Sequence, residues 1–291
     1  MQKFKIVSDS SCDLPKEFLE KHDIKDVRFY VTFDGTNFLK ESVDITIDEY
    51  FHRLSTEENF PKTSQPSPQD YIDVFTPILD EGLDILCFCL SSHLSGSYQS
   101  AVNAAAILKD DYPNLNIRII DSEQAFISTS LMILRAIEHQ NAGKELDLVA
   151  DYIERLKKET RIIIALETLE NLKRGGRIGT ATAMVGSLLN LKPILTLNSG
   201  IIGPLTKVRG RKKSLSTLVE IMEKDTNLDL EKYDFMVGHA MCEEDGKSLK
   251  NSVETALGTK LTTPLLNTGP TIGTHIGIGA VAIAYAKKMD L

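Results

Sequence analysis

The stretch "LDILCFCLSSHLSGSYQSA", residues 83–101, decides the fold class of this chain and raises the question of its function. It opens with a continuous apolar run, which is typical of a strand buried on both faces. The rest, from Ser91 onward, holds five serines and one glycine, and a helical pattern begins near Tyr98. In open α/β sheets, ligands bind where such strands give way to helices.

Outward from this stretch, other short apolar segments are each followed by a segment of helical length. The early ones are "FKIVSD" (4–9), "DVRFYVTF" (26–33) and "NIRIIDS" (116–122). This alternation predicts βα units on a mainly parallel sheet flanked by helices. Helix starts are marked by Thr46 with Glu49, and by "SPQD" (67–70).

The chain is long enough, at 291 residues, for two domains. Two helical patterns, 126–141 and 147–159, are separated by the polar segment "AGKELD". We therefore expect an N-terminal α/β domain over 1–158 and a second α/β domain over 159–291. Further strands are expected in 161–167, 192–197, 235–240 and 260–266, and an apolar last helix, able to pack back on the first domain, after His275.

Composition narrows the class of partner. The formal net charge of −8 makes nucleic acid an unfavourable default partner. No stretch has the length of a signal peptide core or a bilayer span, so we expect a cytoplasmic protein. The cysteines form no CxxC pair, and Cys87 and Cys89 should lie on one face of a strand as small buried hydrophobes. We therefore expect no metal and no cofactor.

Four hydroxyl-rich loops follow or precede predicted elements: "SDSSCDLP" (8–15), "KTSQPSP" (62–68), "SSHLSGSYQS" (91–100) and "DS" (121–122). Gly96 allows close approach of the backbone to a ligand, and Ser95 can donate a hydrogen bond to it. A single serine more often caps its helix. The repetition across loops, together with His275 in a glycine-rich loop, favours a site for a small anion.

Basic residues gather in "KVRGRKK" (207–213), which contains Arg209 and Arg211, and in "LKRGGRIG" (172–179), which contains Arg177. Many such runs are only a solvated face. Because no aromatic residue is interleaved, a phosphate group, a protein or a membrane surface is a better partner than a nucleic acid. Gly277, Gly279 and Ala282 spell a GxGxxA pattern, but the ribose-binding acid of a Rossmann site does not follow it, so a dinucleotide cofactor is not expected. The chain matches neither the Walker A nor the nucleophile-elbow pattern.

Taken in order, several motifs make the chain similar to the DegV family. They are "SDSSCDLP", "TSQPSP", "SSHLSGSYQSA", "ETLENLKRGGRIG", "LLNLKPIL", "KVRGRKK" and "GPTIGTHIGIGA", and they extend from residue 8 to about residue 280. Two departures are Ile278, where the family pattern carries a proline, and "EQAFISTSLM" (123–132), which replaces a pattern of small residues.

The resemblance implies a two-domain carrier, without chemistry of its own, that holds one long-chain fatty acid in an internal tunnel. Such proteins are subunits of bacterial fatty acid kinase: they present the carboxylate to an ATP-dependent kinase, carry the acyl phosphate and contact the membrane transiently. The family pattern places the carboxylate at residues that here are Thr63, Ser64, Ser95 and His275, supported by Gly96 and Thr274. It makes Arg177, Arg209 and Arg211 candidates for kinase or phosphate contact.

Two other functions remain open from the sequence. A serine hydrolase acting on lipid-like esters would use Ser95 and His275, which both lie in glycine-rich loops. A nucleic-acid-binding regulator would use the basic stretch at 207–213.

Overall fold

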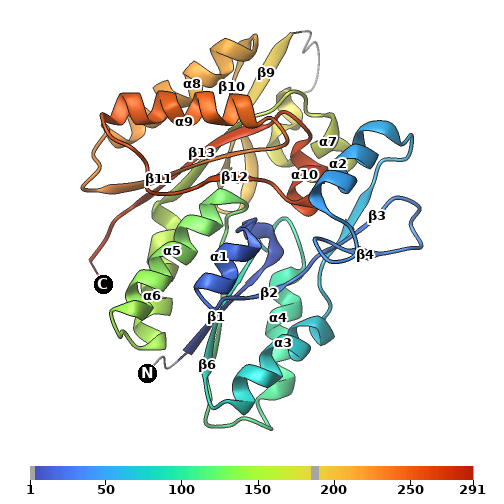
Figure 1. Ribbon diagram of the computed structural model, residues 1–291, viewed down its shortest axis with the longest axis vertical. Helices are drawn as coiled ribbons and strands as arrows, with labels where there is room; N and C mark the ends of the chain where they lie inside the picture. The colour runs from blue at the N-terminus through green and yellow to red at the C-terminus, as the bar shows by residue number, and fades with distance from the viewer. Residues whose placement is uncertain (1–3, 185–189, 291) are drawn as a thin grey trace.

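A computed structural model describes residues 4–184 and 190–290. The first two residues of the motif "LLNLKPIL", Leu188 and Leu189, lie outside the described part. Figure 1 shows a layered α/β molecule in which helices alternate with sheets from one end of the long axis to the other.

The first sheet is parallel throughout. Its strands are, in spatial order, β2 (Lys25–Val27), β1 (Phe4–Asp9), β6 (Asp84–Cys89) and β7 (Ile117–Asp121). One face packs on α3 (Pro68–Asp80) and α4 (Ser97–Leu108), and Cys87 and Cys89 are buried in that core, as predicted. The other face packs on α1 (Lys16–Lys21), α5 (Ile127–Asn141) and α6 (Leu146–Leu156). The predicted α/β class with a parallel N-terminal sheet is confirmed.

The second sheet is mixed and contains strands from residue 160 onward. Its strands are, in spatial order, β10 (Ile201–Arg209), β9 (Leu191–Asn198), β8 (Thr160–Ala165), β13 (Val281–Lys287), β11 (Tyr233–His239) and β12 (Leu265–Asn267). Helices α8 (Arg211–Thr226) and α9 (Glu243–Leu257) cover its outer face. Helix α5 packs on its inner face, so one apolar core joins the two sheets. The predicted boundary near residue 158 falls just before β8 and stays a prediction.

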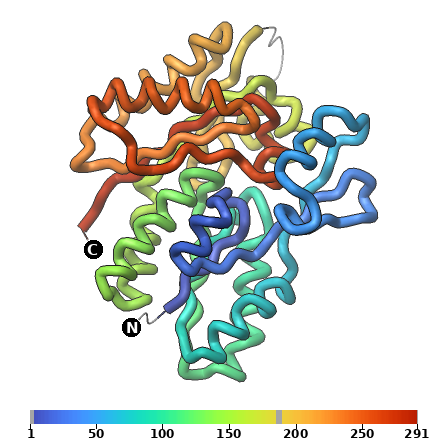
Figure 2. The backbone as a smooth tube through the Cα atoms, in the orientation of Figure 1, coloured from blue at the N-terminus to red at the C-terminus, as the bar shows by residue number. Residues whose placement is uncertain are grey.

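A small third sheet projects from the first half of the chain (Figures 1 and 2). It consists of β4 (Leu39–Lys40), β3 (Tyr30–Thr32) and β5 (Lys62–Ser64), and α2 (Ile47–Thr56) packs on it. The predicted single strand over 26–33 is therefore wrong. The predicted strand divides into β2 and β3 because Phe29, which lies between them, makes its backbone hydrogen bonds outside the first sheet. Its N–H donates to the Ser10 hydroxyl, and its carbonyl accepts the Glu41 N–H.

The expected last helix after His275 is also wrong. His275 lies within a short helix, α10 (Pro270–Ile276), and the apolar run that follows is strand β13, between β8 and β11. A strand covered on both faces has a continuous apolar sequence, which cannot be told from a buried helix by periodicity. The strand expected in 260–266 begins only at Leu265.

The remaining elements are short. They are α7 (Glu170–Arg174) and the 3-10 turns η1 (Ser10–Cys12), η2 (Lys157–Glu159) and η3 (Gly179–Met184). Among residues 4–184 and 190–290, no helix combines the length and the apolar character needed to cross a bilayer.

Candidate functional site

The carboxyl ends of β1 and β6 meet at one edge of the first sheet, where Asp9 organises the hydroxyl-rich loops. The buried Asp9 carboxylate accepts hydrogen bonds from the Leu90 N–H at 2.8 Å, the Ser97 hydroxyl at 2.7 Å and the Ser11 hydroxyl at 2.6 Å. Burial raises the pKa of Asp9 to about 6, against the opposing effect of these bonds. Several of the loop hydroxyls therefore serve the fold, as the simpler interpretation of a single serine expects.

Ser91 and Ser95 have different positions from Ser97. The Ser91 hydroxyl donates to the carbonyl of Gly200 at 2.9 Å and so joins the loop to the β9–β10 turn of the second sheet. The Ser95 hydroxyl accepts the N–H of Ser97 at 3.2 Å and borders a cavity. Tertiary contacts thus divide the serines of one loop between folding and a site.

This cavity has a volume of about 360 Å³ and lies between the first half of the chain and the second sheet. Its polar lining comes from Thr63, Ser64, Gln65, Ser95, Arg177, Thr271 and His275. Its apolar lining includes Phe29, Leu90, Leu94, Leu172, Ile202 and Ile272. A cavity with convergent donors in part of its wall and aliphatic side chains elsewhere suits an amphipathic ligand.

His275 and Thr63 contact each other at the edge of this cavity. The His275 Nε2 atom lies 3.0 Å from the Thr63 hydroxyl, although the two residues are 212 positions apart in the chain. Burial, and secondarily the positive charge of Arg177, lowers the pKa of His275 to about 4. The imidazole is therefore neutral at neutral pH, and the Thr63 hydroxyl can pair with it while facing a ligand.

The His275 ring is also confined on its other side. A Cβ atom built on Gly175 would lie 2.2 Å from His275 Nδ1, so only glycine allows this approach. The Nδ1 atom is buried and has no hydrogen-bond partner among the described residues. Steric contact rather than a second hydrogen bond therefore holds the ring at this edge.

Arg177 supplies positive charge to the same cavity. Its Nε donates to the Leu94 carbonyl at 3.1 Å and its Nη1 to the Gly175 carbonyl at 2.8 Å. These bonds orient the guanidinium without neutralising it, because both acceptors are uncharged carbonyls. Arg177, expected from the resemblance to meet a kinase or a phosphate, thus lies in the cavity wall.

The other predicted site residues lie elsewhere. Gly96 donates its N–H to the Gln65 side chain at 2.8 Å. The buried Thr274 hydroxyl contacts the Tyr50 hydroxyl and donates to the Pro270 carbonyl. Arg209 is exposed at the end of β10, and Arg211 forms ion pairs with Asp245 and Glu167.

The site residues predicted from the sequence did not include Gln65, Thr271 or the apolar lining. Gln65 follows Thr63 and Ser64 directly in a motif already singled out, so its position was the available signal. The apolar residues carry no comparable signal, because a side chain that lines a cavity and one that fills a core look alike in a sequence.

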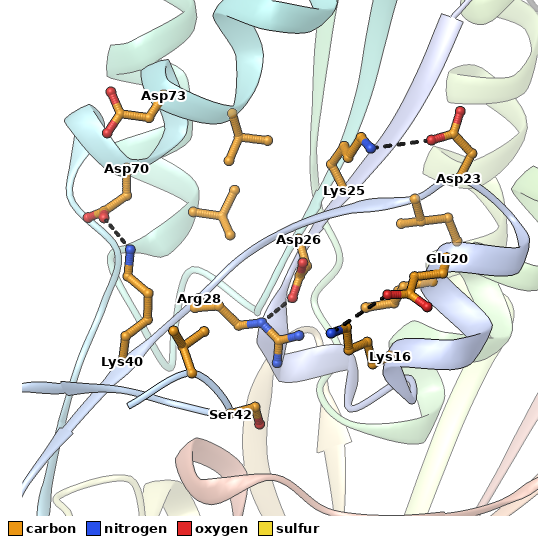
Figure 3. A pocket seen from close by; sticks show the side chains of 15 residues that line it. Lys16, Glu20, Asp23, Lys25, Asp26, Arg28, Lys40, Ser42, Asp70 and Asp73 are labelled. Atoms are coloured by element: carbon orange, nitrogen blue, oxygen red, sulfur yellow. Dashed lines mark ion pairs between the residues drawn. The ribbon is translucent and has the colours of Figure 1, made fainter. Parts of the chain in front are cut away.

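A larger cleft of about 590 Å³ lies outside this site and has a different character (Figure 3). Charged side chains of both signs border it, and Figure 3 shows them in pairs: Lys40 with Asp70, Lys25 with Asp23, Arg28 with Asp26 and Lys16 with Glu20. Its charged walls are unsuited to a hydrocarbon chain. The smaller cavity at His275 is therefore the candidate site.

Comparison with known proteins identifies the family. The family model described as "Uncharacterised protein, DegV family" matches residues 3–288. The chain belongs to the DegV family. A DegV domain-containing protein of Listeria monocytogenes is 32% identical over 99% of each chain, and one of Clostridium perfringens is 30% identical over 98% of this chain and 99% of its own.

Solved structures of DegV-like proteins share the whole fold. A stearic acid-binding protein of Eubacterium ventriosum is 34% identical, with a TM-score of 0.92 and coverage of 98% of each chain. A DegV family protein of Thermus thermophilus, described by its fatty acid binding, is 30% identical, with a TM-score of 0.88 over 98% of this chain and all of its own. The resemblance seen in the motifs is confirmed.

The geometry of this DegV chain also bears on hydrolysis. A hydrolase would need His275 to accept a proton from Ser95. The Nε2 atom faces Thr63 instead, and the Ser95 hydroxyl accepts a backbone N–H. The site therefore favours binding over nucleophilic chemistry.

Proposed function

We propose that this DegV family protein binds one long-chain fatty acid in the cavity at His275. The carboxylate would lie among Thr63, Ser64, Ser95, His275 and Arg177, and the alkyl chain along the aliphatic wall. The carrying observation is the contact of His275 with Thr63 at the edge of a cavity whose remaining lining is largely apolar. The fatty acid binding described for the relatives from Eubacterium ventriosum and Thermus thermophilus supports the same ligand class.

The energetics of such a ligand match this division of the cavity. Each buried methylene contributes about 0.8 kcal/mol, so the tail supplies most of the affinity. The neutral imidazole and the hydroxyls fix the orientation of the head group. Arg177 attracts the carboxylate, and the absence of a second fixed charge among the cavity-lining residues leaves the ligand free to be released.

We further propose that the bound carboxylate is presented to a separate ATP-dependent kinase, which phosphorylates it to an acyl phosphate that the protein carries. A transient contact with a membrane surface would serve the exchange of fatty acid. The exposed Arg209 offers an unpaired cation for a kinase among the described residues, whereas Arg211 is held by Asp245 and Glu167. The carrier itself would perform no chemistry.

The test is to denature purified protein and to identify the released lipid by mass spectrometry. We expect about one fatty acid of C14 to C20 per chain, in keeping with typical pocket sizes. Thr63→Val should reduce retention, whereas Thr255→Val, on the exposed surface of α9, should not. Protein that carries no fatty acid and takes up none when it is added would refute the proposal.

A further inference from the structure

Helix α10, which carries His275, begins without a cap from its own sequence. Its N-cap residue is Gly269, which has no side chain that could accept hydrogen bonds from the free N–H groups of the first turn. The acceptor comes instead from a distant part of the chain. The Glu41 Oε2 atom accepts the Thr271 N–H at 2.8 Å, across 230 residues of sequence.

Glu41 is deeply buried and is itself held in place. The residue is 2% exposed, and its other carboxylate oxygen accepts a hydrogen bond from the hydroxyl of Ser10. The Ser10 hydroxyl in turn accepts the Phe29 N–H at 3.0 Å. Ser10 directly follows Asp9 at the end of β1, so Glu41 links the edge of the first sheet to α10.

A second carboxylate, that of Asp13, holds the residue before the N-cap, Thr268. Asp13 Oδ2 accepts the Thr268 hydroxyl at 2.7 Å. A Cβ built on Gly269 would lie 2.7 Å from Asp13 Oδ1 and 3.9 Å from Glu41 Oε2, so both carboxylates converge on the helix start. Burial and the charge of Glu41 raise the pKa of Asp13 well above its usual range, which relieves the repulsion between the two carboxylates. The hydrogen bonds from Thr268 and Gly269 and the charge of Arg28 act in the opposite direction.

We propose that Glu41 is a positioning residue for His275, acting through the first turn of α10. Side chains on both walls of the cavity are then positioned by consecutive residues at the end of β1. Asp9 at the end of β1 sets the loop of Ser95 through Ser97, and the next residue, Ser10, sets His275 through Glu41. This inference rests on the proposed function only for its binding readout.

The experiment compares Glu41→Ala with Glu41→Gln and with Glu254→Ala. Glutamine keeps an acceptor for the Thr271 N–H, whereas alanine does not. Glu254 is a matched control, because it is also buried and accepts a backbone N–H, that of Leu261 at 3.1 Å, but lies on α9 away from the cavity. Stearic acid affinity is measured by displacement of a fluorescent fatty acid, and the His275 imidazole by ¹⁵N NMR of delipidated protein.

We expect Glu41→Ala to weaken stearic acid binding about tenfold and to shift or broaden the His275 imidazole signals. Glu41→Gln should restore affinity to within about threefold of the unaltered protein, and Glu254→Ala should lower thermal stability while leaving binding and the His275 signals unchanged. Unchanged His275 signals in Glu41→Ala, or equal losses of affinity in Glu41→Ala and Glu254→Ala, would overturn the inference.

Two provisions keep the test decisive. If Glu41→Ala does not fold, Glu41→Asp replaces it, because the shorter side chain withdraws the carboxylate from the Thr271 N–H while keeping its charge. We expect Glu41→Asp to shift the His275 imidazole signals. Unchanged signals in this variant would count against the inference. If the unaltered protein binds no stearic acid, the proposed function fails, and the NMR signals alone decide the role of Glu41.

Discussion

At the scale of single residues, burial rather than residue type separates the roles of similar side chains. Ser95 and Ser97 are two positions apart, yet one borders the cavity and the other donates to Asp9. His275 is neutral at neutral pH because removing the imidazolium from water is costly and because Arg177 is nearby. A neutral histidine beside a fixed cation gives the site one permanent charge.

The lowered pKa of His275 predicts a pH effect on stability. As pH falls from 6.5 toward about 4, the unfolded chain binds a proton on this residue that the folded protein does not, so the free energy of unfolding decreases. The effect should reach about 2–3 kcal/mol between pH 7 and pH 4.5. Urea unfolding of the unaltered protein and of His275→Gln, at pH 7 and pH 4.5, measures it.

The comparison with His275→Gln is needed because Asp9 contributes with the opposite sign. Its raised pKa makes stability decrease as pH rises from its usual value of 3.8 to about 6. The difference between the two proteins isolates His275. An identical loss of stability on acidification in both would contradict the prediction.

At the scale of elements, α10 is held by close contacts from several parts of the chain. Its Gly273 lies against Phe51 of α2: a Cβ atom at this position would be 2.3 Å from Phe51 Cζ. The adjacent Tyr50 hydroxyl is 2.5 Å from the Thr274 hydroxyl. Asn171, on α7, donates to the Thr274 carbonyl at 3.1 Å. The helix that carries His275 is therefore fixed by its neighbours rather than by its own seven residues.

Gly273→Ala should therefore separate α2 from α10. We expect a loss of about 1–3 kcal/mol in the free energy of unfolding, as for other overpacked cores. Phe51→Leu in the same chain removes the ring edge and should recover part of this loss. A double-mutant cycle by urea unfolding measures the coupling, and strictly additive effects would mean that the helices do not meet at Gly273.

The helix starts were predictable from local sequence. Thr46 with Glu49 and Ser67 with Asp70 form the expected capping boxes at α2 and α3. These signals are short-range, because the cap and its partner are three residues apart. Helix α10 has no such signal, and its acceptor, Glu41, is recognisable only in three dimensions.

At the scale of the whole molecule, the site lies where the two halves of the chain meet. Helix α5 packs on both sheets, and the Ser91 hydroxyl reaches the Gly200 carbonyl of the second half. A ligand in the cavity would thus contact both halves, whereas Arg209 is exposed and does not line the cavity.

This separation predicts that Arg209→Glu impairs phosphorylation of the bound fatty acid by the proposed kinase and spares lipid loading. We expect phosphorylation of the bound fatty acid to decrease at least about tenfold, because a favourable contact becomes a repulsive one. Lys224→Glu is the control. Lys224 is also an exposed cation, but it lies on the last turn of α8, the helix whose first turn follows Arg209. Equal losses of lipid and of phosphorylation in Arg209→Glu would show that Arg209 serves the cavity instead.

The sequence by itself determined the α/β class, the limits of strand β1, the capping boxes and the loops in which donors gather, because these depend on local patterns. Only the tertiary structure decided which hydroxyls face the cavity, where residues 30–64 leave the first sheet, and that the apolar run after His275 is a strand. Those outcomes depend on partners far apart in sequence, such as Thr63 with His275 and Glu41 with Thr271. A local pattern reports burial and periodicity, but it does not report which distant group satisfies each donor.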